Sequence, residues 1–592
     1  MNIFEKAPNK WIIIAILLVV SVVPFSNIFN NVFALDDFDF FIYWEGIKHL
    51  NISSFFAGDL PLSHIHVYRP IRSVVQAVFY YFAQTNLWPY HILSIVVHFV
   101  NTVLIYLITK KLSKQAIALM TAIFFAVLPV HVVAITFITA VFDTMGITFL
   151  LGSFLLFITF KEGHKKKYLY SSLGLALLAY FTNEITLTLP LLIILYYFCF
   201  REVNKKILWR NVKYYWWYFL GAIAVFTIRY FILKDIYKGS LITKIDLIPR
   251  LLTASKAFIK YIYLMVINTP LSVHHPVEIV YTVDTKVFGS IVLIIALIVL
   301  AIYLYKKGQK IYTFIITWFF ISMLPVANII QIANFIDERY LYLASYAWSL
   351  LLAIIVYLIY FYFKDKKGAL IAMLLVLILS FTYGYMTWQR NKVWQTEETL
   401  WRDVITKYPN NIKAYNNLGF YYSENGDNEK AEEYYRKAIG MNENYSIAYT
   451  GLAETAIVND DYIKAAEYLE QAIELNPNKP GYFNQLGMIY SNLEQWDKAK
   501  KNYQKALDIY PDFFESSFNL AVIYVQEQNF TESLKYFQKS AELRPDDVET
   551  VFGVGMSYLG LGKEIEGKQY LRKALLLDPK FPPALEVLEG LE

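Results

Sequence analysis

Residues 411–444 read NIKAYNNLGFYYSENGDNEKAEEYYRKAIGMNEN, and this block sets the pattern for the C-terminal third of the chain. Four more blocks of 34 residues follow it without insertion, beginning at Tyr445, Lys479, Phe513 and Asp547. Small side chains allow paired helices to approach closely, and proline ends a helix because it lacks an N–H donor. Small residues recur at three positions of the blocks (Gly419, Ala453, Gly487, Ala521, Gly555; Ala431, Ala465, Ala499, Ser533, Gly567; Ala438, Ala472, Ala506, Ser540, Ala574), and prolines close most units (Pro409, Pro477, Pro511, Pro545, Pro579).

This pattern is typical of tetratricopeptide repeats (TPRs), so the sequence predicts a TPR domain over residues 411–592. The domain would contain five repeats and the start of a capping helix. Such repeats stack into a superhelix with a concave groove, which usually holds an extended peptide or a partner helix. A scaffold for oligomerisation or assembly is the alternative use of the same fold.

The composition of the whole chain is too apolar for a soluble protein. Of its 592 residues, 57% are hydrophobic, 18% aromatic and 17% charged, which indicates a polytopic membrane protein. The formal net charge of +5 divides into about −11 on the last 182 residues and about +16 on the remainder, so two differently built domains share the chain. The single cysteine, Cys199, excludes an internal disulfide.

Eleven apolar segments approach the length of about 20 residues that a membrane-spanning helix needs. We therefore predict an all-α protein with a membrane domain of about 11 spans over residues 1–390, a joining helix over 391–410, and the TPR α-solenoid. The predicted spans lie near residues 11–29, 89–109, 115–131, 138–160, 168–182, 184–200, 214–233, 287–305, 311–329, 340–363 and 369–388.

Lysine and arginine residues fill every second loop between these segments. Positively charged loops stay in the cytoplasm, so the N-terminus is predicted to be cytoplasmic. The odd number of spans then places the TPR domain on the non-cytoplasmic side, together with long loops at 30–88 and 234–286. In the first of these loops, residues 72–82 predict a short interfacial helix. The basic loops contain Lys110, Lys111 and Lys114; Lys161, Lys165, Lys166 and Lys167; Arg201, Lys205, Lys206, Arg210 and Lys213; Lys306, Lys307 and Lys310; and Lys364, Lys366 and Lys367.

A carboxylate-rich stretch, from Asn31 to Glu45, follows the first predicted span directly. Carboxylates are costly at membrane depth, so those beside a span either line a site or face water. The simpler interpretation is that Asp36 and Asp37 face water and cap the end of the first helix. Asp39 is expected to be solvated.

Five motifs follow one another along the membrane half, and a sixth marks its end. They begin with Tyr68-Arg69-Pro70, Tyr90-His91, Leu128-Pro129, Asn183-Glu184 and Glu338-Arg339, and the last runs from Trp394 to Trp401 and is followed by Pro409. In order and spacing they resemble the transmembrane-and-TPR proteins called TMTC, which are O-mannosyltransferase-like enzymes with a GT-C type membrane fold. The resemblance runs over nearly the whole chain.

The resemblance implies a membrane glycosyltransferase that moves a sugar from a polyprenyl-phosphate carrier to a Ser or Thr hydroxyl of a protein, which the TPR groove presents. GT-C enzymes have an acidic pair at the reaction centre, and the matching residues are Asp36 and Asp37. A positioned carboxylate can take the proton of a weakly nucleophilic hydroxyl. In some GT-C enzymes such a carboxylate helps to hold a divalent metal, here Mg²⁺ or Mn²⁺, and the same two aspartates would be its ligands.

For the donor phosphate, the resemblance points to Arg339 first and to Arg69 second, because a guanidinium suits phosphate. The chain departs from the family where Ala140-Val-Phe-Asp143 replaces Gly-Arg-Ala-Asp and where Asn183-Glu184 replaces Lys-Glu. The two missing cations suggest a different donor head group or a redistributed phosphate site. Supporting candidates are Glu184, Glu338, Asp143, His274 and His275.

Other classes of function remain open at this point. A non-catalytic membrane-anchored TPR adaptor would not need the acidic loop. A ligase of lipid-linked oligosaccharides would use similar chemistry, whereas a transporter predicts polar residues along several spans, and here the ionisable residues gather in the outer loops. The chain contains no Walker A sequence and no Gly-x-Gly-x-x-Gly motif, which argues against a nucleotide-driven mechanism. The expected partners are membrane lipid, the lipid-linked donor and an acceptor protein, and not nucleic acid.

Overall fold

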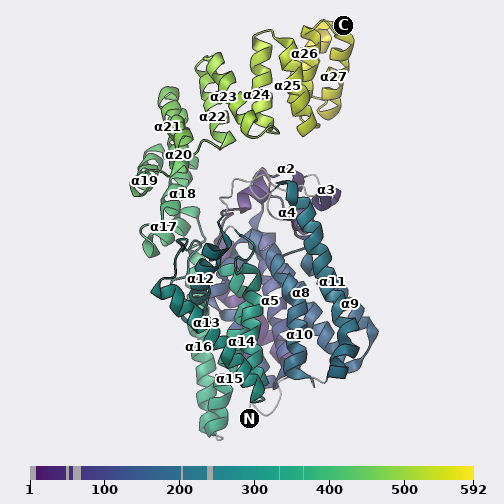
Figure 1. The fold of residues 1–592 in the computed structure, drawn as a ribbon, viewed down its shortest axis with the longest axis vertical. Coiled ribbons are helices and arrows are strands. Elements are labelled where there is room, and N and C mark those ends of the chain that lie inside the picture. The colour runs from purple at the N-terminus through teal and green to yellow at the C-terminus, as the bar shows by residue number, and fades with distance from the viewer. Residues whose placement is uncertain are drawn as a thin grey trace. The chain divides into compact units, whose positions relative to one another are not determined.

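The computed structural model describes residues 9–48, 52–57, 68–201, 205–236, 245–332, 334–363 and 366–591. These residues are predominantly helical and include no β-strand, so the all-α prediction is confirmed. The chain divides into two compact units, Met1–Pro409 and Asn410–Glu592, and each is described by itself (Figure 1).

The first unit is built from helices that differ widely in length. Short 3₁₀ segments cover Val23–Phe25, Ile28–Asn30, Pro129–His131, Glu184–Thr188, Leu324–Val326 and Glu338–Tyr340, and one π-helical turn covers Asp39–Tyr43. The α-helices are α1 (Lys10–Val22), α2 (Glu45–Lys48), α3 (Ile52–Ala57), α4 (Pro70–Ala83), α5 (Leu87–Leu112), α6 (Gln115–Val127), α7 (Val132–Thr136), α8 (Ile138–Gly163), α9 (Lys166–Tyr180), α10 (Leu189–Phe200), α11 (Lys205–Ile236), α12 (Leu247–Ile267), α13 (Thr285–Lys306), α14 (Lys310–Met323), α15 (Leu341–Phe363), α16 (Lys366–Lys392) and α17 (Glu397–Lys407).

Seven helical stretches of the described residues are long and apolar enough to cross a membrane, and a bent pair, α6 with Pro129–Thr136, is an eighth candidate. Each predicted span coincides with a helix, although α9 and the stretches Glu184–Phe200 and Lys310–Val326 are shorter than a full span. The protein is therefore an integral membrane protein, and the number of eleven spans stays a prediction. The seven stretches are Lys10–Asn30, Leu87–Leu112, Ile138–Gly163, Tyr214–Leu233, Thr285–Lys306, Glu338–Phe363 and Lys367–Lys392.

Two of these helices, α13 and α16, leave most of their apolar side chains exposed. Leu293 and Ile302 of α13 and Leu377 and Phe381 of α16 are examples. Contiguous apolar surface of this extent is unfavourable in water and suits contact with lipid chains. The exposed apolar surface thus agrees with placement in a membrane.

The bend between α6 and α7 amounts to 55° and occurs at Pro129. The break leaves carbonyl groups without helical partners, and side chains from other helices replace them. His98 Nε2 lies 3.0 Å from the Ala126 carbonyl oxygen, and Thr387 Oγ1 donates to the Val127 carbonyl oxygen at 2.8 Å. His98 Nδ1 also lies 2.9 Å from the hydroxyl of Tyr342. Helices α5, α15 and α16 thereby fix the bend that leads into α8.

Three of the longer helices in the first unit lie outside the predicted spans, and two of them were predicted from the sequence. The interfacial helix predicted at 72–82 is α4, which begins two residues earlier, at Pro70. The loop predicted at 234–286 contains α12, whose Lys256 and Lys260 interrupt its apolar character. The joining helix is α17, and Thr396 caps it by accepting a hydrogen bond from the Thr399 N–H.

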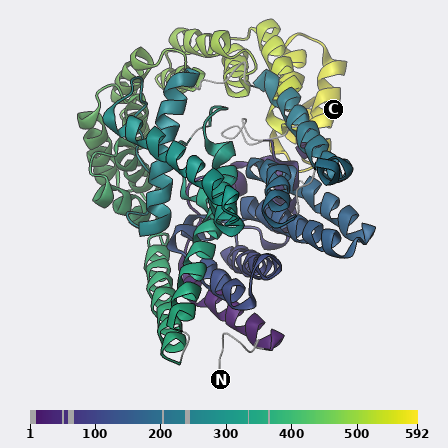
Figure 2. The ribbon, with the colours of Figure 1, turned by 60° about the horizontal axis from the view of Figure 1, so that its bottom comes forward.

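The second unit consists of antiparallel helix pairs that follow one another in a curved row (Figures 1 and 2). Five pairs correspond to the five predicted repeats, and α28 follows as the capping helix. The helices are α18 (Ile412–Glu424), α19 (Asn428–Met441), α20 (Ser446–Val458), α21 (Tyr462–Leu475), α22 (Pro480–Asn492), α23 (Trp496–Ile509), α24 (Phe514–Gln526), α25 (Phe530–Leu543), α26 (Val548–Gly560), α27 (Glu564–Leu577) and α28 (Pro582–Leu591).

Large aromatic side chains occupy the space that small residues leave between these helices. The buried ring of Tyr435 in α19 lies against Gly419 of α18 and Gly451 of α20. Tyr503 of α23 lies against Gly487 of α22 in the same way. A Cβ atom on Gly451 would overlap the Tyr435 ring, so the first two repeats depend on the absence of a side chain there.

We expect Gly451→Ala to destabilise the TPR domain by about 1–3 kcal/mol, because an extra methyl group in a packed interior displaces the Tyr435 ring. Hydrogen exchange of the α18–α20 amides in the detergent-solubilised chain measures this effect. Gly440→Ala in α19 is the matched control, since no atom lies within 4 Å of a Cβ placed there. It should leave stability unchanged or raise it by up to about 1 kcal/mol. Equal exchange in both variants would contradict the packing described.

Candidate active site

The acidic stretch turns sharply just after the first membrane helix. Asp37 is 1% exposed, and its Oδ2 accepts a hydrogen bond from the Ala34 N–H at 3.1 Å. Its Oδ1 accepts hydrogen bonds from the Thr139 N–H at 2.7 Å and from the Thr139 hydroxyl at 2.6 Å. Oδ1 of Asp37 thus fastens the turn to the first residues of α8, while Oδ2 closes the turn itself.

The two predicted aspartates differ in accessibility. Burial raises the pKa of Asp37 to about 7, and the hydrogen bonds from Thr139 and Ala34 counteract part of that rise. Asp36 is half-buried, whereas Asp37 is buried. The two neighbouring carboxylates therefore differ in burial, and Asp37 holds the turn through its hydrogen bonds.

The raised pKa of Asp37 gives a pH dependence of stability. The folded state keeps the proton of Asp37 up to about pH 7, whereas the unfolded chain loses it near pH 4, so folding loses stability as the pH rises between these values. The loss approaches about 4 kcal/mol at most. Denaturant unfolding of the wild type and of Asp37→Asn in detergent measures it, because the variant does not titrate there. A wild type that gains stability with pH relative to the variant would refute the assignment.

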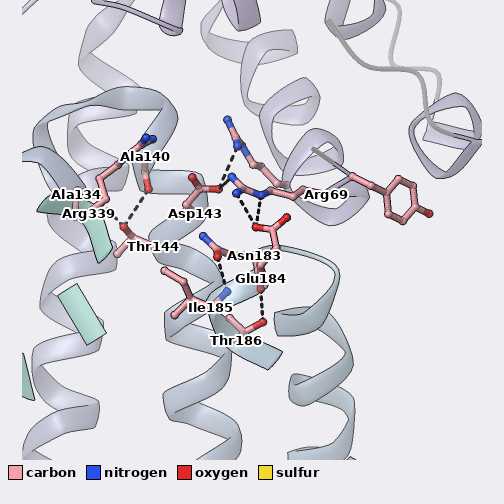
Figure 3. Close-up of polar contacts among 12 residues, drawn as sticks. Arg69, Ala134, Ala140, Asp143, Thr144, Asn183, Glu184, Ile185, Thr186 and Arg339 are labelled. Atoms are coloured by element: carbon pink, nitrogen blue, oxygen red, sulfur yellow. Dashed lines mark hydrogen bonds and ion pairs between the residues drawn. The ribbon is translucent and has the colours of Figure 1, made fainter. Parts of the chain in front are cut away.

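Arginine and carboxylate side chains gather next to this turn (Figure 3). Arg69, at the start of α4, donates from Nη1 to Asp143 Oδ1 of α8 at 2.7 Å. The same guanidinium donates from Nη2 and Nε to Glu184 Oε2 at 2.6 and 2.9 Å. Three residues predicted from distant parts of the sequence are therefore in direct contact.

A second arginine completes the surroundings of Glu184. Arg229 of α11 lies with its Nη1 3.1 Å from Glu184 Oε1. Its Nη2 and Nε donate to the backbone carbonyl of Tyr68 at 2.7 and 3.2 Å. Glu184 is thus held between Arg69 and Arg229.

Arg72, one turn after Arg69 on α4, differs from both. It is 4% exposed, and its Nη1 contacts Asp143 Oδ1 at 3.2 Å. Its Nε and Nη2 are buried and have no hydrogen-bond partner among the described residues. The guanidinium lies over the Phe40 ring, 4.5 Å from the centroid. Burial lowers the pKa of Arg72 to about 10, and the charges of Asp143 and Asp36 oppose that shift.

Arg339 is the fourth arginine of this cluster. It forms a bidentate ion pair with Asp337, with Nη2 2.6 Å and Nε 2.9 Å from Oδ2. The positive charge of Arg339 acts to lower the pKa of both Arg69 and Arg72. Burial lowers the pKa of Arg69, but the charges of Asp143 and Glu184 outweigh that effect and raise it. Four arginines thus pair with three carboxylates, Asp143, Glu184 and Asp337, and the charge of Asp36 also acts on Arg72.

The remaining predicted residues lie apart from these ion pairs. Glu338 Oε1 lies 2.9 Å from His275 Nε2 and accepts from the Ser272 N–H at 2.5 Å. His274 is half-buried, and its carbonyl oxygen accepts from the Ser272 hydroxyl at 3.1 Å. The structure thus joins Glu338 to His275 in a buried pair and does not include either in the arginine cluster.

Comparison with known proteins assigns both parts of the chain. Residues 69–231 match the family described as dolichyl-phosphate-mannose-protein mannosyltransferase. Residues 412–445, 447–479, 482–513, 514–547 and 548–581 match tetratricopeptide repeats. A protein O-mannosyl-transferase of Caenorhabditis elegans is 26% identical over 458 residues, which are 73% of this chain and 63% of that protein. The protein O-mannosyl-transferase Tmtc3 of Drosophila melanogaster is 30% identical over 127 residues, which are 21% of this chain and 13% of that protein.

The chain is thus similar to protein O-mannosyl-transferases, one of them a Tmtc protein, and to tetratricopeptide repeats. It spans 63% of the worm relative's length. Among solved structures, the TPR protein YrrB aligns with a TM-score of 0.29 at 22% identity, over 32% of this chain and 97% of that one. A Pseudomonas aeruginosa pilF protein aligns with a TM-score of 0.31 at 17% identity, over 34% and 91% of the two chains.

Two arginines of this cluster were not singled out from the sequence, although the sequence holds a signal for each. Arg72 lies three residues after Arg69, so both fall on one face of a helix that begins at Pro70. Arg229 lies inside an apolar segment predicted to span the membrane, where an ionisable side chain indicates a functional or paired position.

The predicted pair of aspartates does not fit a divalent cation. Both oxygens of Asp37 accept hydrogen bonds from Ala34 and Thr139, which leaves its carboxylate committed to the protein. Across the part of the chain that the structure describes, no three His, Cys, Asp or Glu side chains are grouped so as to hold a metal.

Proposed function

We propose that this protein is a membrane glycosyltransferase that moves a sugar from a polyprenyl-phosphate donor to a Ser or Thr hydroxyl of a protein. The observation that carries the proposal is the unpartnered side of the buried Arg72 guanidinium next to the half-buried Asp36. A cation with unpartnered N–H donors suits a lipid phosphate, and a neighbouring half-buried carboxylate suits proton transfer from a protein hydroxyl. The similarity of residues 69–231 to mannosyltransferases that use dolichyl-phosphate-mannose supports the same chemistry.

In the proposed reaction, Asp36 takes the proton of the acceptor hydroxyl as its oxygen attacks the anomeric carbon. The bond from the acceptor oxygen to the sugar forms, and the bond from the sugar to the phosphate oxygen breaks. The electron pair leaves with the polyprenyl phosphate. Arg72 donates hydrogen bonds to that phosphate through Nε and Nη2, while Arg69 and Arg339, which the family resemblance favours, supply the surrounding positive field. Asp37 fixes the turn that presents Asp36.

The proposal includes an orientation in the membrane. Every candidate residue lies in a loop or at a helix end that the charge pattern assigns to the non-cytoplasmic side, opposite the lysine-rich loops. The TPR domain follows the last span and would share that side, where its groove would present the acceptor. A protease that reaches the repeats only from the cytoplasm would contradict this orientation.

The direct test uses the purified full-length chain with synthetic polyprenyl-phosphate sugars, beginning with mannose. Candidate acceptor proteins are incubated with each donor, and mass spectrometry detects a hexose-sized mass shift on Ser or Thr. We expect transfer from at least one donor. Failure with every lipid-linked donor would overturn the enzymatic proposal and favour the adaptor.

A further inference from the structure

The joining helix α17 contacts the turn that carries Asp36. At the first residue of this helix, Glu397 Oε1 accepts a hydrogen bond from the Leu35 N–H at 3.1 Å. Leu35 directly precedes Asp36 and has a φ of 56°, in the left-handed region that costs a side-chain-bearing residue about 1–2 kcal/mol. Glu397 therefore holds Leu35, the strained residue of the turn, while the hydrogen bonds between Asp37 and Thr139 hold the turn just after it.

The opposite end of α17 is linked through His275 to the segment that carries Arg339. The hydroxyl of Tyr408, the residue after the helix, lies 2.9 Å from His275 Nδ1. His275 Nε2 lies 2.9 Å from Glu338 Oε1, and the two side chains are 2% and 0% exposed. Burial raises the pKa of Tyr408 to about 12, so its hydroxyl stays protonated and can donate a hydrogen bond to Nδ1. With Nδ1 as the acceptor of this hydrogen bond, Nε2 of His275 is the ring nitrogen that donates to Glu338.

Between its two ends, α17 is fixed to the membrane unit. Asp403 lies 2.7 Å from Arg390 of α16 and 2.6 Å from Lys407. Lys407 also donates to the Leu271 carbonyl oxygen at 2.5 Å. Leu400 and Val404 are fully buried beneath these ion pairs. A helix held at both ends and in the middle transmits a fixed spacing between the residues at its ends.

We propose that Glu397 and Tyr408 are positioning residues, through which α17 sets the Asp36 turn and the Arg339 segment relative to each other. This inference rests on the proposed function, since both segments belong to the proposed active site. The TPR domain begins at Asn410, directly after Tyr408. The same short helix therefore both orders the site and precedes the repeats along the chain.

The experiment compares Glu397→Ala, Glu397→Gln and Glu398→Ala in the full-length chain. Removing the acceptor should accelerate hydrogen exchange at the Leu35 amide about 10-fold and lower kcat by a similar factor, while donor KM stays near the wild-type value. Glutamine should restore both, because its amide oxygen also accepts from the Leu35 N–H. Glu398 pairs with Arg402 on the same turn of α17, so its alanine variant controls for loss of a carboxylate.

Tyr408→Phe tests the other end of the helix, because it removes the hydroxyl and keeps the ring. We expect lower kcat and faster amide exchange around Ser272, whose N–H donates to Glu338. Wild-type exchange and wild-type kcat in both Glu397→Ala and Tyr408→Phe would overturn the inference. If the wild-type chain transfers no sugar, the proposed function fails, yet the exchange rates at Leu35 and Ser272 still decide whether α17 orders these segments.

Discussion

Asp36→Asn is expected to lower the rate of sugar transfer by about 10²–10⁴-fold, the usual contribution of a general base. Asparagine has nearly the same shape but cannot take the proton of the acceptor hydroxyl. The effect should appear in kcat, because donor and acceptor contacts persist. Donor KM and the thermal midpoint of the detergent-solubilised chain should stay close to the wild-type values.

Asp39→Asn is the matched control for this substitution. Asp39 belongs to the same stretch and is also half-buried, yet it begins the π-helical turn and is assigned no role in the reaction. Its variant should transfer sugar at the wild-type rate. Full transfer by Asp36→Asn would remove the proposed base and leave the adaptor as the better explanation of the membrane-anchored repeats.

The regular parts of the fold were predictable from the sequence because each repeats a simple pattern. The 34-residue period locates the helix pairs of the repeats, and apolar runs between basic loops locate the helices of the membrane unit. The helix α12 was not predicted, since Lys256 and Lys260 interrupt its hydrophobicity, which is the signal that identifies spans. The bend at Pro129 was also not predicted. The hydrogen bonds that replace those lost at the bend come from His98 and Thr387, which lie on distant helices.

The candidate site was predictable only in part, because contacts between distant residues decide the role of each side chain. The motif Asp36-Asp37 did not tell which of the two is the base, because the contact of Asp37 with Thr139, about a hundred residues later, is not visible in the motif. Arg69 and Arg339 were favoured as phosphate ligands, yet Asp143, Glu184 and Asp337 already pair with them. These pairings decide which arginine keeps unpartnered N–H donors. They join residues that are far apart in the sequence, so no local sequence pattern predicts them.

Arg72→Met is expected to raise the KM for the lipid-linked donor about 10- to 100-fold, since each hydrogen bond to a charged group contributes about 1.5–3 kcal/mol. Arg69 still pairs with Asp143 at 2.7 Å in this variant, so that carboxylate is not left unpaired. Methionine can also occupy the space over Phe40 that the guanidinium fills. The fold should therefore persist while the phosphate contact disappears.

Further variants separate a phosphate contact from a general loss of charge. Arg72→Lys keeps the charge but not the planar fork, so it should recover only part of the donor affinity. Arg201→Met is the matched control, because Arg201 ends α10, lies in a basic loop and donates to Tyr196 at 2.9 Å. Free polyprenyl phosphate should inhibit the wild type more strongly than Arg72→Met. If donor KM and this inhibition are unchanged in Arg72→Met, the phosphate is bound elsewhere, and Arg69 and Arg339 become the next candidates, because each guanidinium has five N–H donors.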